Sequence, residues 1–377
     1  MYITITTPQT PINTQISITE LFNQTNTIPN NTIQYNTKTI TTETDTYWKE
    51  KYTKNFKSHI DSQIKYLAST VKTKFTKAPN MSEYYEKPFF IPKRNGKLRR
   101  IDAPTEPLMI YLRNVKYFLE NICHCNAHNN AYAYIKHRNP KKCATQHMTH
   151  KYFLKLDLKH FFPSCTKELV MTQLKKIYPI NYSIQENQKE WEAVLQTAFL
   201  NNSLPQGTPL SPTLSNIIMI PFDFNITNIL KSQDITYTRY ADDIFLSSNK
   251  PIYTQYIIKI IEDVLRKNEY TFTINKEKTR IGTNNGKNWM LGLMINNQHN
   301  ITVGHRRKKK FKALLYNFAK DLTNGTHWSI IELQSLLGEY SYIASIEPNT
   351  INAIIETYNT KFNFNTINKL KQELKNQ

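Results

Sequence analysis

Two adjacent aspartates at the turn of an apolar hairpin constrain this chain more than any other feature. Asp242 and Asp243 lie within TYTRYADDIFLSS (236–248), between two runs that predict strands. A third carboxylate, Asp157, ends the apolar run of KYFLKLDLKHFF (151–162), which starts as a buried strand. Carboxylates beside core strands are costly unless a cation compensates them. The sequence therefore predicts adjacent strand ends that present three carboxylates to a cationic partner.

Magnesium suits such a site, because it prefers oxygen ligands from a few carboxylates together with substrate phosphates. Two ions about 3.5–4 Å apart can activate an attacking 3′-hydroxyl and stabilise a departing pyrophosphate. The alternative is a set of solvated turn aspartates, which an isolated Asp-Asp pair would favour. Because this pair lies between apolar strands, we expect two Mg²⁺ ions, for which Mn²⁺ can substitute, at Asp157, Asp242 and Asp243.

The charge balance favours a polyanionic partner. The 377 residues carry 49 Lys and Arg against 29 Asp and Glu, a formal charge of +20, and each phosphate that a cation neutralises releases bound counterions. Four cysteines do not make a disulfide framework. The start, MYITITTPQT, lacks the features of a signal peptide, and no stretch is apolar enough to span a membrane. We therefore expect a cytoplasmic protein with no membrane segment.

Helices and strands alternate along the rest of the chain. Residues 1–45 are rich in Thr, Asn and Gln and predict either a flexible arm or a partner-binding region. Apolar residues recur at helical spacing from Trp48 through Tyr52, Phe56, Ile60 and Ile64 to Leu67. Further helices are expected at 166–200, from 212 to about 230, at 251–269 and beyond 305. Strands are expected in a hairpin at 89–104 that turns at Asn95-Gly96, at 271–279, and in a hairpin of 288–296 with 301–304.

Seven blocks between residues 89 and 304 resemble, in order, those of prokaryotic reverse transcriptases. They are FFIPKRNGKLRRIDAP (fingers), AYAYIKHRNPKKCATQH, FLKLDLKHFFPS, LPQGTPLSPTLSN, YADD, NKEKTR and NWMLGLMIN (primer grip). The resemblance implies an α+β right-hand polymerase, with fingers, a palm of antiparallel sheet with packed helices, and a helical thumb. It divides the chain into an N-terminal arm (1–45), fingers and palm (46–304) and thumb (305–377). The implied activity is RNA-directed synthesis of DNA from dNTPs on an RNA template.

The same resemblance implies roles at the nucleotide site. Lys93 and Arg99 match the cations that clamp the triphosphate, with Arg100 as the alternative to Arg99. Phe162 matches the aromatic residue that excludes a 2′-hydroxyl, although it could instead be a core residue, as Phe161 is expected to be. Three further matches are Gln206 and Gly207 beside the nucleotide, Asn216 facing outward from the following helix, and Lys278, which either protonates pyrophosphate or is a surface lysine.

A basic run follows the primer grip, where the family has its thumb. HRRKKKFKALLYNF predicts a helix with an apolar underside formed by Leu314, Leu315 and Phe318. Such a helix suits the backbone of an RNA–DNA duplex, which is recognised by shape rather than by base edges. The alternative is an ordinary solvated face. From its position we expect contact with nucleic acid at Arg306, Arg307, Lys308, Lys309 and Lys310.

The chain also contains a group of possible zinc ligands: Cys123, Cys125, His128, Cys143 and His147. Their spacing fits no zinc pattern, and we expect no zinc.

Two departures separate the chain from retron enzymes: Cys143-Ala144-Thr145-Gln146-His147 replaces Asn-Ala-x-x-His, and Met290-Leu291-Gly292 replaces Val-Thr-Gly. We therefore expect a stand-alone bacterial enzyme that copies a dedicated non-coding RNA in anti-phage defence, with protein partners left open. Two alternatives remain: a retron enzyme that makes RNA-linked DNA, and a catalytically idle RNA-binding protein.

Overall fold

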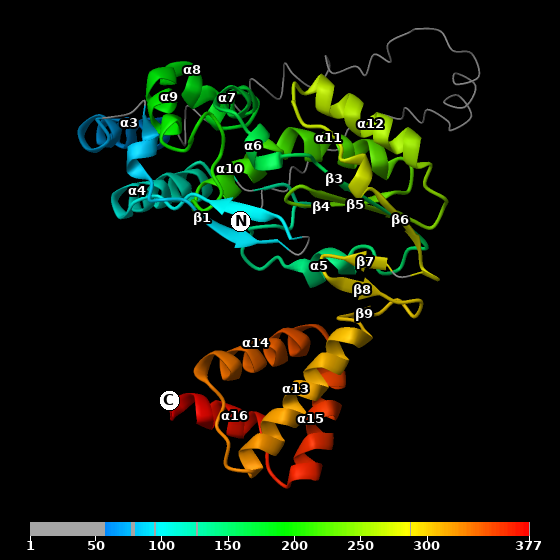
Figure 1. Cartoon of the computed structure of the whole chain (residues 1–377). Coiled ribbons are helices and arrows are strands. Elements are labelled where there is room, and N and C mark those ends of the chain that lie inside the picture. Colours follow the sequence, from blue (N-terminus) through cyan, green and yellow to red (C-terminus); the bar gives the residue numbers. More distant parts are fainter. Residues whose placement is uncertain (1–56, 77–79, 94–95, 126, 287, 377) are drawn as a thin grey trace. The chain divides into compact units, whose positions relative to one another are not determined.

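The computed structural model describes residues 57–76, 80–93, 96–125, 127–286 and 288–376, all within a compact unit spanning Trp48–Gln377 (Figure 1). The predicted arm at 1–45 lies outside the described residues. So does the first part of the helix expected from Trp48, whose described portion is α3 (Lys57–Lys74).

A four-stranded antiparallel sheet forms the centre of the molecule. It contains β3 (Tyr152–Asp157), β4 (Thr236–Tyr240), β5 (Asp243–Ser248) and β6 (Arg280–Thr283), in the order β4-β5-β3-β6. Alternate residues of β5 enter two different cores, because successive side chains point to opposite faces of a sheet. The buried apolar side chains form two cores, a larger one and a second one shared by the helices that follow residue 305. Ile244 and Leu246 belong to the larger core, whereas Phe245 belongs to the core of the C-terminal helices. Burial on both faces explains the uninterrupted apolar run Ile244–Leu246 of β5.

Helices cover the larger core on one side of this sheet (Figure 1). Three of them, α10 (Ser211–Ile218), α11 (Ile220–Lys231) and α12 (Thr254–Lys267), contribute buried residues to it. One long helix was expected from 212 to about 230, but the structure divides it at Met219. Pro221 lies in the first turn of the second helix, where its missing N–H costs least.

The fingers hairpin was predicted correctly. Strands β1 (Phe89–Pro92) and β2 (Leu98–Ile101) pair antiparallel, and Gly96 has a φ of +78° in the connection; Asn95 lies outside the described residues. The neighbouring helices contribute to the larger core; they are α4 (Glu106–Tyr117), η3 (Phe118–Ile122), α6 (Phe161–Ser164), α7 (Lys167–Leu174), α8 (Ile180–Glu186) and α9 (Gln188–Gln196).

Residues 271–279 were expected to form a strand, and this was wrong. They contain only an isolated bridge at Ile274 and the 3-10 turn η4 (Lys276–Lys278), and β6 begins afterwards. The segment nevertheless follows the end of β3, because the backbone N–H of Asn275 donates to the carbonyl of Asp157 at 2.7 Å. This contact brings η4 beside the carboxylates.

The primer-grip region forms three strands rather than the expected single hairpin. These are β7 (Asn288–Met290), β8 (Leu293–Ile295) and β9 (Ile301–Thr302), in that order in the sheet. Leu291 and Gly292 both have positive φ, 54° and 81°. That backbone suits a two-residue hairpin turn, so it divides a segment that the apolar pattern alone made one strand.

Four helices close the chain: α13 (His305–Thr323), α14 (Ile330–Ile346), α15 (Pro348–Phe362) and α16 (Thr366–Lys375). They share a core with α5 (Pro140–Thr145) and with the β7–β9 sheet. Of the helices that the structure describes, none has both the length and the apolar character required to cross a membrane. The proposed limits of fingers, palm and thumb remain a prediction.

Candidate active site

The three aspartates meet at one end of the central sheet. Asp157, the last residue of β3, pairs with Asp243, the first residue of β5, so the two side chains lie on the same face. Asp242 occupies the turn between β4 and β5, and its carbonyl accepts a hydrogen bond from the N–H of Leu158 at 3.0 Å. The antiparallel register therefore brings together carboxylates that are 85 residues apart in the sequence (242 minus 157).

Burial and mutual repulsion disfavour the charged forms of these groups. Burial raises the pKa of Asp242, and the neighbouring charges of Asp243 and Asp157 raise it further. Burial likewise raises the pKa of Asp243, opposed by Lys155, whose ammonium lies 2.9 Å from its Oδ2. Such a cluster gains most from a cation that can approach several oxygens at once.

Two lysines already face the cluster. Lys155 is two residues before Asp157 on the same strand face, and its Nζ lies over the ring of Phe245 at 5.3 Å. The Nζ of Lys278 in η4 lies 2.8 Å from Oδ1 of Asp157, and this hydrogen bond raises the pKa of Lys278. The expected lysine is therefore beside the carboxylates, and Lys155 is a neighbour that sequence reasoning missed. Its position in the block FLKLD was the available signal.

The donor set fits a divalent cation. All three groups offer carboxylate oxygens, which hard cations prefer, and the two lysines do not neutralise three carboxylates. The fit lies in the chemistry of the donors rather than in their present side-chain geometry, since Asp243 is bonded to Lys155 and Asp157 to Lys278. As they stand, no three side chains of His, Cys, Asp or Glu among the described residues converge in metal-binding geometry.

The fingers hairpin separates Arg99 from its alternative. Ile101 lies on the same strand face as Arg99. The side chain of Ile101 is close to the loop, because its Cγ2 lies 2.9 Å from where a Cβ would stand if Gly207 had one. Arg100, on the opposite face, forms an ion pair with Asp102 at 2.7 Å. The face of Arg99 is therefore the one turned towards the Gln206-Gly207 loop. The hydrogen-bond ladder of the hairpin continues past β1, because the N–H of Lys93 donates to the carbonyl of Lys97 at 2.7 Å. The side chains of Lys93 and Arg99 are both exposed.

Gln206 and Gly207 form the junction between this hairpin and the palm. The carbonyl of Gln206 accepts a hydrogen bond from the N–H of Asp102 at 2.7 Å. Gly207 has a φ of +124°, and a Cβ there would lie 2.8 Å from the carbonyl oxygen of Asp102. Only glycine combines this backbone with so close an approach.

Phe162 and Phe161 have different surroundings, as expected. Phe161 is buried in the larger core, whereas Phe162 is only partly buried against it. The ring of Phe162 meets that of Tyr134 edge-on at 6.4 Å. Burial raises the pKa of Tyr134, and the nearby Asp242 raises it further, whereas Arg99 lowers it. Tyr134 thus contacts Phe162 and lies within electrostatic range of Asp242 and Arg99, a position that sequence reasoning did not assign.

The basic run of α13 divides into two groups. Arg306, Lys309 and Lys310 are exposed. Arg307 instead binds both carboxylate oxygens of Glu339, at 2.5 and 2.7 Å, and its guanidinium stacks on Tyr342 at 4.0 Å. Lys308 pairs with Glu347 at 2.9 Å. Of the predicted apolar underside, Leu315 and Phe318 are buried, and Leu314 is partly buried against the same core.

The cysteines weighed as zinc ligands are distributed over two cores. Cys123 and Cys125 lie in the larger core, and Cys143 lies in the core of the C-terminal helices. His147 bonds Ser247 and Thr238, each at 2.7 Å.

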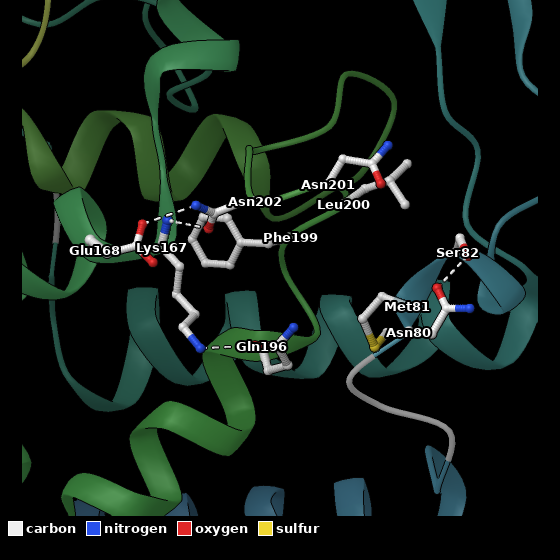
Figure 2. A pocket seen from close by; sticks show the side chains of 10 residues that line it. All are labelled: Asn80, Met81, Ser82, Lys167, Glu168, Gln196, Phe199, Leu200, Asn201 and Asn202. Carbon is white, nitrogen blue, oxygen red and sulfur yellow. Dashed lines mark hydrogen bonds between the residues drawn. The ribbon is translucent and has the colours of Figure 1, made fainter.

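A hollow of about 220 Å³ is lined by residues from 80–82, 167–168 and 196–202 (Figure 2). Its polar groups bond one another, as in the contacts of Lys167 with Gln196 at 2.9 Å and of Glu168 with Asn202 at 3.1 Å. None of the predicted site residues lines it.

Comparison with known proteins identifies the family. The profile of the family described as reverse transcriptase (RNA-dependent DNA polymerase) matches residues 91–318, more than half of the chain. The chain is 28% identical over 293 residues to the Retron Ec83 reverse transcriptase of Escherichia coli, covering 76% of this chain and 89% of that protein. It is 28% identical over 271 residues to the Retron Ec73 reverse transcriptase of the same organism, covering 69% and 82%. Among solved structures, apo telomerase from Candida tropicalis gives a TM-score of 0.44 at 13% identity, covering 76% of this chain and 61% of that one.

The family match and the antiparallel sheet that carries the YADD turn lead to the same assignment. This chain belongs to the reverse transcriptase (RNA-dependent DNA polymerase) family and is an RNA-directed DNA polymerase with the right-hand polymerase fold.

Proposed function

We propose that this reverse transcriptase is of the retron type and copies a dedicated non-coding RNA into DNA that stays linked to RNA. The observation that carries the proposal is the similarity to two retron enzymes over most of both chains. It favours the retron alternative over the stand-alone enzyme that the changes at Cys143–His147 and Met290–Gly292 had suggested. The RNA template and dNTPs are then its substrates, and its site of action is the bacterial cytoplasm.

Asp157, Asp242 and Asp243 are the proposed ligands of two Mg²⁺ ions. Ions held by these carboxylates would supply activation of the 3′-hydroxyl and compensation of the charge on the triphosphate. The raised pKa values of Asp242 and Asp243 support this role, because these carboxylates gain more from a cation than exposed ones do.

The remaining residues bind and orient the nucleotide. Arg99 and Lys93 donate hydrogen bonds to phosphate oxygens from the face of the fingers hairpin that Gly207 meets. Phe162 closes the space beneath the sugar, so that a 2′-hydroxyl is excluded. Lys278, held beside Asp157, gives a proton to the departing pyrophosphate.

The exposed cations of α13 hold the product duplex. Arg306, Lys309 and Lys310 are available for phosphates, and a Lys or Arg side chain binds a backbone without regard to sequence. Arg307 and Lys308 fix the helix to its neighbours through Glu339 and Glu347.

Primer extension on poly(rA)/oligo(dT) tests the chemistry. We expect wild type to incorporate dTTP and Asp242→Asn to fail. Asp234→Asn is the matched control, because Asp234 is an exposed aspartate paired with Lys250 at 2.7 Å near the same hairpin. A wild-type protein that binds the hybrid but never extends it would support the idle RNA-binding protein instead.

The retron assignment is tested on the protein expressed from its native locus and purified with its bound nucleic acid. We expect nucleic acid purified with it at raised salt to contain one dominant RNA together with DNA whose mobility changes after RNase treatment. Asp242→Asn should retain the RNA and lack the DNA. Recovery of random cellular RNA, or of DNA that RNase leaves unchanged, would contradict the retron assignment while leaving the polymerase assignment intact.

We propose anti-phage defence as the biological role. The expectation is that cells with the wild-type locus resist at least one phage in a broad panel to which Asp242→Asn cells are sensitive. Equal sensitivity of the two strains across the panel would refute this role.

A further inference from the structure

A buried guanidinium lies directly behind the aspartate turn. Arg239 of β4, three residues before Asp242, is fully buried, as is its partner Asp223 of α11. Its Nε and Nη2 donate to the two carboxylate oxygens of Asp223, at 2.8 and 2.6 Å. Tyr237 donates a further hydrogen bond to Asp223 at 2.5 Å. A buried charge is costly without such a partner, so the pair fixes where the guanidinium can lie.

The remaining nitrogen of Arg239 reaches the turn itself. Its Nη1 donates to the carbonyl oxygen of Ala241 at 3.1 Å. Ala241 has a φ of +57°, a left-handed backbone that residues other than glycine rarely adopt. The accepting carbonyl belongs to the peptide group that leads into Asp242. The hydrogen bond therefore holds an unfavourable backbone in the orientation that places the Asp242 side chain.

Asn216 connects the same guanidinium to the nucleotide side of the site. Its Oδ1 accepts from Nη1 of Arg239 at 3.3 Å, and its Nδ2 donates to the carbonyl of Ala133 at 2.8 Å. Ala133 precedes Tyr134, whose ring meets Phe162. Asn216 was expected to face outward, but it is buried, because both ends of its amide find partners in the interior.

We propose that Arg239 is a positioning residue for the metal-binding turn. Asp223 neutralises its charge, Asn216 orients its third nitrogen, and that nitrogen sets the Ala241 peptide so that Asp242 faces Asp157 and Asp243. The inference rests on the proposed metal-binding role of Asp242. Lysine cannot replace the guanidinium, because its single ammonium lacks the planar fork that bonds Asp223 and Ala241 together.

The test is Mn²⁺ binding to the free protein, followed by electron paramagnetic resonance, with Arg239→Lys as the variant. Removal of a hydrogen bond from a charged donor predicts Mn²⁺ affinity about tenfold weaker, equivalent to about 1.4 kcal/mol. We also expect kcat to fall while the KM for primer–template is unchanged. Tyr237→Phe is the matched control, since it removes one contact to Asp223 and leaves the Ala241 contact in place; its Mn²⁺ affinity should equal that of wild type.

The outcomes separate this inference from the proposed function. If Asp242→Asn binds Mn²⁺ as wild type does, the metal site itself is misassigned. If Asp242→Asn loses Mn²⁺ binding but Arg239→Lys keeps it, only the positioning role is wrong. If Arg239→Lys does not fold, Asn216→Ala decides by the same measurement: weaker Mn²⁺ binding supports the inference, and unchanged binding overturns it.

Discussion

The basic run of α13 should separate into a nucleic-acid-binding half and a structural half. Replacing Arg306, Lys309 and Lys310 by glutamine removes three exposed cations and keeps good helix formers in place. Each phosphate that the protein no longer neutralises reduces the slope of log affinity against log salt by about 0.7–0.9, so the slope of the triple variant should be smaller by about 2–3. Its stability should hardly change, because exposed charges contribute little.

The companion variant, Arg307→Gln with Lys308→Gln, should behave in the opposite way. It removes the two-point contact with Glu339, the stacking on Tyr342 and the pair with Glu347. These interactions are partly buried, and removing them should lower the free energy of unfolding by about 1–3 kcal/mol. The salt dependence of hybrid binding should stay close to that of wild type.

Fluorescence anisotropy of a labelled RNA–DNA hybrid across a series of KCl concentrations measures the slope, and urea denaturation measures stability. The triple variant should change only the salt slope of hybrid binding, and the double variant should change mainly the stability. An unchanged slope in the triple variant would show that the exposed half of the run is only a solvated face. A slope change confined to the double variant would refute the division that the ion pairs suggest.

Three other variants test the site. Asp242→Asn and Asp243→Asn should each abolish DNA synthesis and leave hybrid binding nearly intact, since both serve the metals; near-normal incorporation by either folded protein would end the catalytic assignment. Phe162→Val should raise the ratio of rATP to dATP incorporation, and an unchanged ratio would place the sugar selection elsewhere. Burial lowers the pKa of His147 from 6.5 to about 3, so between these values the unfolded chain binds a proton that the folded chain does not. Stability should therefore fall as the pH drops, by about 1.2 kcal/mol between pH 7 and 5.5; urea denaturation of wild type and His147→Gln at both pH values checks this, and an equal decrease in the two proteins would contradict it.

Local sequence pattern predicted secondary structure correctly where a segment has its own periodicity or turn residues. The strand at 151–157, the hairpin around Asp242 and Asp243 and the helix from 305 have a periodicity or a turn that needs no distant partner. Gly207 was singled out by the resemblance to the family's block rather than by local pattern, and the structure gives it a φ of +124° and a close approach to the carbonyl of Asp102. Residues 271–279 were misassigned because alternating residues favour a strand there, while a strand forms only where a neighbour offers a ladder of hydrogen bonds.

The sequence by itself determined the chemistry of this protein: three carboxylates in strand contexts, an ordered set of polymerase blocks and a strong positive charge. The tertiary structure decided the surroundings of residues of the same type. It separated Arg99 from Arg100 by strand face, Arg306 from Arg307 by an ion pair, and buried Arg239 and Asn216 behind the turn that carries Asp242 and Asp243. The physical reason is that charge and residue type are local properties, whereas burial and hydrogen-bond partners depend on segments distant in sequence. Glu339 and Asp223 contact their arginines only after the chain has folded.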